Sequence, residues 1–269
     1  MHRYKKLLLP LATLLLVPLA ASAQVPELAP LRYETRYDIT LGGLAIGRLR
    51  ITAMEDTFGY RMSVDTKTRG IVDFFAPLKS LATVRGAITE EGEYLPTLYT
   101  SKADKDGDDK DRKVSIAYDD EGRITTRSRV PGDDPKWRPV VPLDKASAAL
   151  DPMTGFFVLR KTLRDAMANE QREASVTTYD GARLATMRVK VVSRARIEVQ
   201  GKHVNAINAV VTRYPIDGYT PKELKKYKEG DPVVHVYFSA DERLMPLVAT
   251  ISLFYGDVRA ELTEYTPVK

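Results

Sequence analysis

The stretch that decides the fold is LRYETRYDITL, residues 31–41. Its side chains alternate in character: Leu31, Tyr33, Thr35, Tyr37, Ile39 and Leu41 occupy the odd positions, and Arg32, Glu34, Arg36, Asp38 and Thr40 the even ones. A period of two is typical of a half-buried β-strand with one solvated face. Gly42-Gly43 follows and suits a tight hairpin turn, which predicts a return strand over 44–54.

The same alternation recurs along most of the chain. It predicts further strands over about 60–66, 80–89, 94–101, 112–118, 123–129, 174–179, 184–192, 195–200, 202–214, 233–238, 246–254 and 257–265. Short runs separated by Gly, Asn or Asp favour an antiparallel meander.

One segment, Asp144 to Asn169, has helical spacing instead. Asp151 suits the N-cap and Pro152 the first helical position, which predicts a helix over 152–168. The apolar stripe holds Met153, Phe156, Phe157, Leu163 and Met167, with Arg160, Lys161, Arg164 and Asp165 mostly outside it. We therefore predict a mainly β fold: a long curved antiparallel sheet, as an open barrel or β-spiral, wrapped around one central amphipathic helix.

The N-terminus predicts export. Basic residues (His2, Arg3, Lys5 and Lys6) precede the apolar run Leu7 to Ala20, and Ala21-Ser22-Ala23 matches the small-residue pattern at a signal-peptidase site. We expect residues 1–23 to be a signal peptide, cleaved after Ala23. A retained N-terminal anchor is the alternative. After cleavage, residues 24–269 would form a single domain without a transmembrane span, located in the periplasm or secreted.

Charge and cysteine content restrict the function. Loss of Arg3, Lys5 and Lys6 would lower the net charge from +5 to +2, which does not predict a nucleic-acid partner. The chain has no cysteine, so thiol nucleophiles, cysteine-ligated zinc and disulfides are excluded.

No motif points to catalysis, a metal or a cofactor. His203 and His235 are isolated within strand-like runs, and no nucleotide-binding or nucleophile-elbow motif is present. The acidic run 104–111 begins like a calcium loop, but Asp109 stands where the EF-hand needs Gly, and Ser115 where it needs Glu. We interpret it as a solvated hairpin tip, and we expect the protein not to be an enzyme.

Two further segments carry apolar side chains that could contact a ligand. Phe74 and Phe75 follow a predicted strand and would form either an exposed contact patch or a lid on the core. The connection from Pro131 to Pro142 contains four prolines and the only tryptophan, Trp137. We interpret Trp137 as a packing anchor, with a binding platform as the alternative.

Several short motifs together resemble the family of exported proteins known as domain of unknown function 3108, over about 33–265. They are Tyr37-Asp38-Ile39 through Gly47, Thr68-Arg69-Gly70-Ile71-Val72-Asp73, Tyr94-Leu95-Pro96-Thr97, Leu150-Asp151-Pro152-Met153-Thr154, Val236 to Asp241 with Arg243 to Pro246, and Gly256 to Leu262. The resemblance implies a periplasmic β protein without an assigned activity or catalytic residues. By architecture, the predicted fold is also similar to periplasmic lipoprotein carriers and β-spiral envelope-integrity proteins.

These observations predict a non-enzymatic periplasmic protein that binds a lipid-like ligand or an apolar partner segment in its curved sheet and contributes to cell-envelope maintenance. The residues expected to line or gate the site are Phe74, Phe75, Trp137, Met153, Phe156 and Phe157. Two alternatives stay open. One is a scaffolding module that binds an envelope protein without a ligand cavity, and the other is an unrecognised polysaccharide or peptidoglycan hydrolase.

Overall fold

The computed structural model describes residues 31–69, 79–104, 112–230, 233–253 and 256–268. The predicted signal peptide and its cleavage site after Ala23, Phe74 and Phe75, and most of the acidic run lie outside the described residues.

Within these ranges the chain forms one antiparallel sheet of 13 strands, in the order β7-β6-β5-β4-β3-β2-β1-β13-β12-β11-β10-β9-β8. The mainly β prediction is therefore confirmed. The strands are β1 Leu31–Leu41, β2 Leu44–Glu55, β3 Gly59–Thr68, β4 Lys79–Ile88, β5 Tyr94–Asp104, β6 Arg112–Tyr118, β7 Ile124–Val130, β8 Glu173–Tyr179, β9 Leu184–Val199, β10 Lys202–Asp217, β11 Val234–Ser239, β12 Pro246–Leu253 and β13 Gly256–Pro267. The runs predicted separately over 184–192 and 195–200 belong to one strand, β9.

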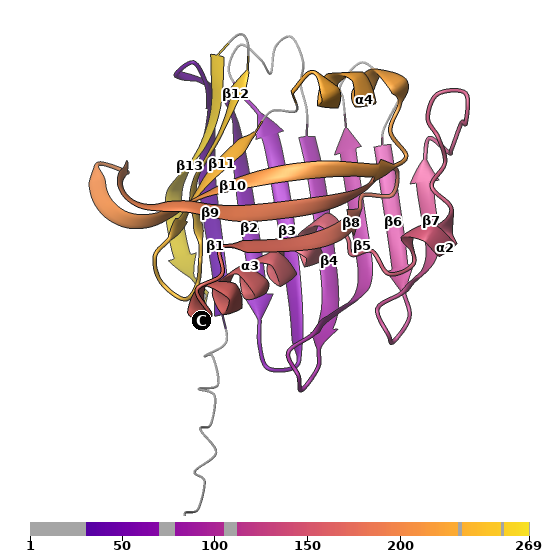
Figure 1. Cartoon of the computed structure of the whole chain (residues 1–269), viewed down its shortest axis with the longest axis horizontal. Helices are drawn as coiled ribbons and strands as arrows, with labels where there is room; N and C mark the ends of the chain where they lie inside the picture. The colour runs from indigo at the N-terminus through magenta and orange to yellow at the C-terminus, as the bar shows by residue number, and fades with distance from the viewer. Residues whose placement is uncertain (1–30, 70–78, 105–111, 231–232, 254–255, 269) are drawn as a thin grey trace, which may run out of the picture.

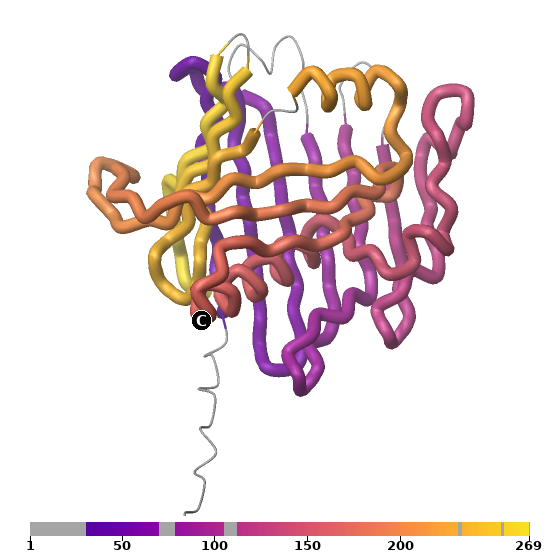
Figure 2. Tube along the Cα trace, viewed as in Figure 1, coloured from indigo at the N-terminus to yellow at the C-terminus, as the bar shows by residue number. Residues whose placement is uncertain are grey.

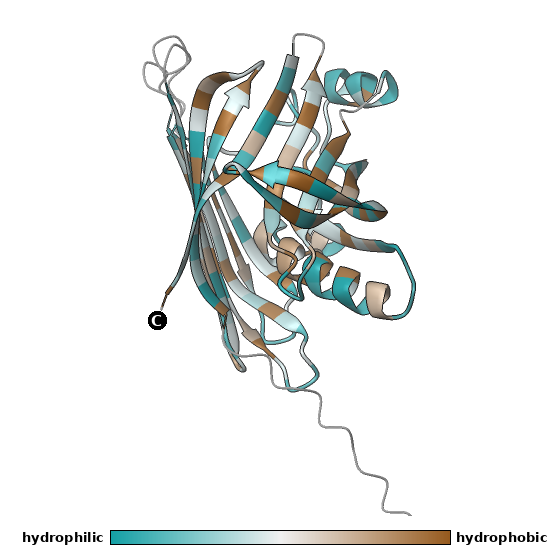
Figure 3. Ribbon diagram, turned by 90° about the vertical axis from the view of Figure 1, so that its left-hand side faces the viewer, coloured by the Kyte–Doolittle hydropathy of each residue, from teal (hydrophilic) through white to brown (hydrophobic). Residues whose placement is uncertain are grey.

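Alternation along each strand decides which face is buried. In β1 the side chains of Tyr33, Thr35 and Tyr37 are buried, and their neighbours are more exposed. Figure 3 shows the same alternation as apolar and polar bands along the strands. Gly42 and Gly43 both have positive φ, at 54° and 88°, which glycine adopts without steric cost and which a two-residue hairpin turn requires.

The described residues contain three helices: α2 Leu143–Ala146, α3 Pro152–Ala168 and α4 Pro221–Lys228. The segment predicted as helical from 144 to 169 thus holds two helices. Asp151 caps α3 as expected, since its Oδ1 accepts hydrogen bonds from the backbone N–H groups of Met153 and Thr154, each at 2.9 Å. Among the described residues, none of the helices has the length and apolar character that crossing a bilayer requires.

The second half of the sheet turns across the first. Figure 1 shows β8, β9 and β10 running across β2 to β6, with α3 beside them. The chain trace in Figure 2 separates the N-terminal strands from the strands that follow α3.

The two edge strands, β7 and β8, are connected through a short segment rather than by a ladder. The N–H of Ile124 in β7 donates to the carbonyl of Ser147 at 2.8 Å, and Leu150 forms a bridge with Thr178 in β8. The sheet is therefore open at this seam but linked across it by residues 147–150.

The core forms where α3 meets both halves of the sheet. Phe157 packs among Tyr60 and Tyr94, on β3 and β5. Leu163, further along α3, belongs to a cluster formed with residues of β8 to β11. One helix thus contributes side chains to both halves.

Candidate ligand-binding pockets

An apolar pocket of about 490 Å³ lies between α3 and the sheet. Its helical wall is formed by Phe156, Leu159 and Leu163. The other lining residues are mostly apolar and come from strands of both halves and the neighbouring loops: Tyr37, Leu49, Ile51, Thr178, Ala185, Met187, Val189, Val211, Tyr219, Val236, Phe238, Leu244, Pro246, Ala249 and Ala260, with Pro152, Gly155, Arg160, Asp180, Arg183 and Arg213. Its volume and lining are those of a small-molecule site.

Helical spacing explains which side chains of α3 face this pocket. Phe156, Leu159 and Leu163 are three and four residues apart and so share one face of the helix. Phe157 is rotated away from that face and is 0% exposed. Its ring centroid lies 5.1 Å from that of Tyr60 and 5.6 Å from that of Tyr94. Of these adjacent phenylalanines, Phe156 therefore faces the pocket and Phe157 the core.

Gly155 lets α3 approach β8 closely. A Cβ atom at this position would lie 2.7 Å from Cγ2 of Thr178, a distance that real Cβ atoms essentially never show. A larger residue would push the helix away from the strand and change the width of the pocket.

Arg160 is buried, at 5% exposure, where its charge needs compensation. Its guanidinium donates to the carboxylate of Glu55 on β2, which also accepts a hydrogen bond from the Tyr94 hydroxyl. Burial alone would lower the pKa of Arg160, but the Glu55 carboxylate and other neighbours raise it, so the side chain stays charged. The sequence pattern placed Arg160 mostly outside the apolar stripe; the pattern could not reveal the partner on β2.

Charged groups gather at the end of the apolar pocket formed by the β8–β9 turn. Oδ1 of Asp180 accepts hydrogen bonds from the N–H groups of Ala182, at 2.8 Å, and Arg183, at 2.7 Å. The guanidinium of Arg183 lies 3.2 Å from the other oxygen of Asp180. Arg213 also lines this pocket, and its guanidinium lies 5.8 Å from the centre of the Tyr219 ring.

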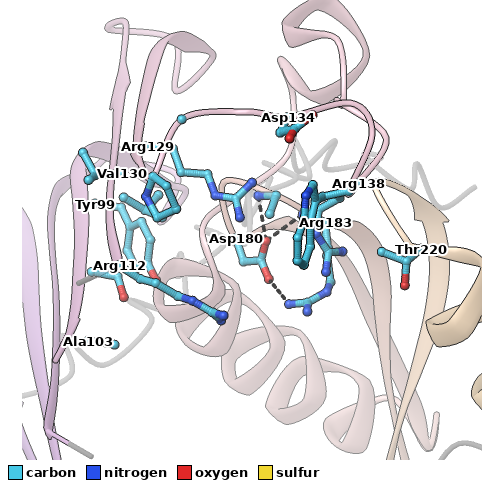
Figure 4. A pocket seen from close by; sticks show the side chains of 16 residues that line it. Tyr99, Ala103, Arg112, Arg129, Val130, Asp134, Arg138, Asp180, Arg183 and Thr220 are labelled. Atoms are coloured by element: carbon cyan, nitrogen blue, oxygen red, sulfur yellow. Dashed lines mark hydrogen bonds and ion pairs between the residues drawn. The ribbon is translucent and has the colours of Figure 1, made fainter. Parts of the chain in front are cut away.

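A second pocket, of about 710 Å³, adjoins the first at this turn, because Asp180 and Arg183 line both. We call it the arginine pocket after Arg112, Arg129, Arg138 and Arg183, which line it together with Tyr99, Ser101, Ala103, Val114, Val130, Pro131, Gly132, Asp134, Trp137, Asp180, Ala182 and Thr220. Figure 4 shows the guanidinium groups of Arg112 and Arg129 extending from β6 and β7 toward Asp180 and Arg183.

Glu223 joins the segments around the arginine pocket. Its carboxylate accepts hydrogen bonds from Nη1 and Nη2 of Arg138, at 2.7 and 2.8 Å, and from Nη2 of Arg183 at 2.6 Å. It also completes the capping box of α4 with Thr220. Burial would raise the pKa of Glu223, but the hydrogen bonds from Arg138, the Thr220 backbone and Arg183 hold it well below its usual range.

The predicted site residues separate into distinct groups. Phe156 lines the apolar pocket, whereas Met153 and Phe157 are buried in the core and line neither pocket. Trp137 lines the arginine pocket and is 82% exposed, so its interpretation as a packing anchor is wrong. Phe74 and Phe75 lie outside the described residues. The four arginines were missed because they are scattered from 112 to 183, with no common motif.

Comparison with known proteins identifies a family and a fold. The family described as "Protein of unknown function (DUF3108)" matches residues 36–263. None of the curated proteins matches the chain. A crystal structure of a β-barrel-like protein of domain of unknown function DUF1849 from Brucella abortus is similar, with a TM-score of 0.53 and 12% identity over 89% of this chain and 98% of that one. At this identity the likeness supports the fold alone.

Proposed function

Since this chain belongs to the DUF3108 family of proteins of unknown function, we propose from its geometry that it binds the apolar part of a lipid-like ligand. The main observation in its support is the pocket of about 490 Å³, with a mostly apolar lining, between α3 and the sheet. Such a wall has few groups to bind a polar solute, and it would shield a hydrocarbon chain from water.

The proposal also covers how the sheet and α3 are arranged. We propose that the curved sheet encloses α3 and that the apolar pocket is the space left between them. The contacts of Phe157 with β3 and β5, and of Leu163 with residues of β8 to β11, support this arrangement.

We also propose that the protein acts without catalysis, in the periplasm, in maintenance of the cell envelope. The signal-peptide pattern of residues 1–23 supports export. The lining of the apolar pocket contains a single carboxylate among the described residues, Asp180. Hydrolysis of a glycosidic bond usually uses two carboxylates, so this lining favours binding over cleavage. A scaffolding module with a filled interior is less well supported, because a pocket is present.

The test uses an uncharged fluorescent probe, N-phenyl-1-naphthylamine, titrated into the purified protein. We expect saturable binding at one site. Ala249 and Ala260 face each other on β12 and β13 and both line the pocket. Ala249→Phe or Ala260→Phe would place a ring in the pocket and should weaken binding at least tenfold.

The matched control is Ser252→Phe, which adds the same ring on β12 at an exposed position. It should leave probe affinity unchanged, and far-UV circular dichroism should show that all variants are folded. If the probe does not bind saturably, or if a folded Ala249→Phe variant binds it as well as the wild type, the proposed function is wrong.

A further inference from the structure

A site of very different character adjoins the apolar pocket. Asp180 and Arg183 line both the apolar pocket and the arginine pocket. A molecule with its apolar part against Phe156 and Leu159 could therefore extend past this turn into the arginine pocket. The part that reached it would meet charged groups rather than hydrocarbon.

The charges around the arginine pocket do not balance. Five guanidinium groups lie in or beside it: Arg112, Arg127, Arg129, Arg138 and Arg183. Three carboxylates form ion pairs with them. Asp133 pairs with Arg127 and Arg129. Glu223 pairs with Arg138 and Arg183, and Asp180 also pairs with Arg183. Among the described residues, Arg112 has no ion-pair partner. Asp134 also lines the pocket and adds a fourth carboxylate; it accepts a hydrogen bond from the backbone N–H of Lys136. Five guanidinium groups against four carboxylates thus leave one positive charge in excess.

From this juxtaposition we propose that the ligand is an amphiphile with an anionic head, its chain in the apolar pocket and its head among Arg112, Arg129 and Arg183. The inference rests on the proposed function and adds the chemistry of the headgroup. Guanidinium groups present planar pairs of donors that match the oxygens of a carboxylate or phosphate. Arg183 is held at the junction by Asp180 and Glu223, so its position is set without the ligand.

Trp137 gives this site its own reporter. It is the only tryptophan in the chain and it lines the arginine pocket. Because the indole is 82% exposed, a headgroup or chain segment that covered it would change the polarity of its surroundings and shift its emission. Tryptophan fluorescence therefore follows the arginine pocket, while displacement of N-phenyl-1-naphthylamine follows the apolar pocket.

The experiment compares amphiphiles with the same twelve-carbon chain and different heads, each below its micelle concentration. Dodecyl phosphate and dodecanoate carry anionic heads, dodecyl maltoside is uncharged, and dodecyltrimethylammonium is cationic. We expect at least one anionic compound to displace the probe with an affinity at least tenfold higher than the other heads, and to shift the Trp137 emission. The difference between phosphate and carboxylate identifies which anion is preferred.

Variants locate the effect. Arg112→Gln combined with Arg129→Gln should lower anionic affinity about tenfold and leave affinity for the uncharged probe unchanged. Arg85→Gln removes an exposed arginine on β4 that lines neither pocket, and should change neither affinity.

Three results would overturn the inference. If all four heads bind equally while Ala249→Phe still blocks them, the headgroup assignment fails and the proposed function stands. The assignment also fails if the double arginine variant keeps the full anionic preference. If inorganic phosphate alone binds as tightly as dodecyl phosphate, and Ala249→Phe has no effect on either, the arginine pocket is a site for a free anion instead. If the wild-type protein binds neither the amphiphiles nor the uncharged probe, the proposed function itself is refuted.

Discussion

The two adjacent phenylalanines of α3 should differ sharply in what they contribute to stability. Phe157 is 0% exposed and contacts Tyr60, Tyr94 and Phe156, with the Arg160 guanidinium 5.4 Å from its ring centre. Phe156 is partly buried and faces the apolar pocket. Truncation of each to alanine removes the same atoms from the same helix, so the pair provides its own control.

The magnitude follows from these contacts. Truncating a fully buried phenylalanine costs about 3–5 kcal/mol, and each well-placed aromatic pair adds about 0.5–1.5 kcal/mol beyond the buried area. With three aromatic neighbours, Phe157→Ala should lower the free energy of unfolding by about 4–5 kcal/mol, or the Tm by about 10 °C in a chain of this size. Phe156→Ala should cost about 2 kcal/mol or less, because its ring already borders open space.

Urea denaturation followed by far-UV circular dichroism measures both values, since the exposed Trp137 would report poorly on the core. Probe binding separates the two roles further: Phe156→Ala should change affinity for N-phenyl-1-naphthylamine in a protein that stays folded. If Phe156→Ala destabilises the protein as much as Phe157→Ala does, the division of α3 into a core face and a pocket face is incorrect.

Two further substitutions test the β-bulge between β4 and β5 and the ion pairs of Glu223. Gly86→Ala should cost about 2 kcal/mol or more in urea denaturation, because its Cβ would lie 2.3 Å from the Leu95 carbonyl oxygen at a β-bulge; Gly132→Ala, with nothing within 4 Å, should be nearly neutral. Glu223→Gln should cost about 1–2 kcal/mol at pH 7, because it removes a charged acceptor from two arginines at a partly screened site. Since folding lowers the pKa of Glu223, its contribution is present above the unfolded pKa of about 4.3 and disappears as the pH falls, so urea midpoints of variant and wild type should converge at acidic pH. A gap that is unchanged at pH 3 would contradict that assignment.

Local periodicity predicts the strands of this protein well. The runs expected over 31–41 and 44–54 correspond to β1 and β2 within a residue, because each strand has one buried and one solvated face. The cap of α3 was equally visible, since Asp151 followed by Pro152 is a local signal. These features depend on neighbours in sequence, and the sequence displays them directly.

α4 was missed for a different reason. Its residues, Pro221–Lys228, are not buried, so the helix has no apolar stripe that periodicity could detect. The signal that could have found it is the capping box, in which Thr220 precedes Pro221 and Glu223 follows at the third helical position. A search for caps independent of hydrophobic pattern would have predicted this helix.

The candidate site itself depends on contacts between distant parts of the chain. Arg160 is buried because Glu55, 105 residues earlier, lies opposite it. The arginine pocket exists because β6, β7 and the β8–β9 turn meet at the seam of the sheet. No local pattern encodes such meetings, and so the sequence named Phe156 and Trp137 as contact residues without showing that they belong to separate pockets.

The way α3 is held explains how one helix can both complete a core and leave a pocket. Asp151 fixes its first turn, Gly155 sets its distance from β8, and the buried pair between Arg160 and Glu55 ties its middle to β2. Breaking such a buried pair costs about 3–5 kcal/mol, so the helix cannot readily move to fill the pocket with its apolar face. Because none of these three attachments involves the pocket-facing side chains Phe156 and Leu159, the shape of the pocket is set independently of what it holds. A ligand then orders little of the protein on binding, and interactions of its head with the arginines should appear almost fully as affinity.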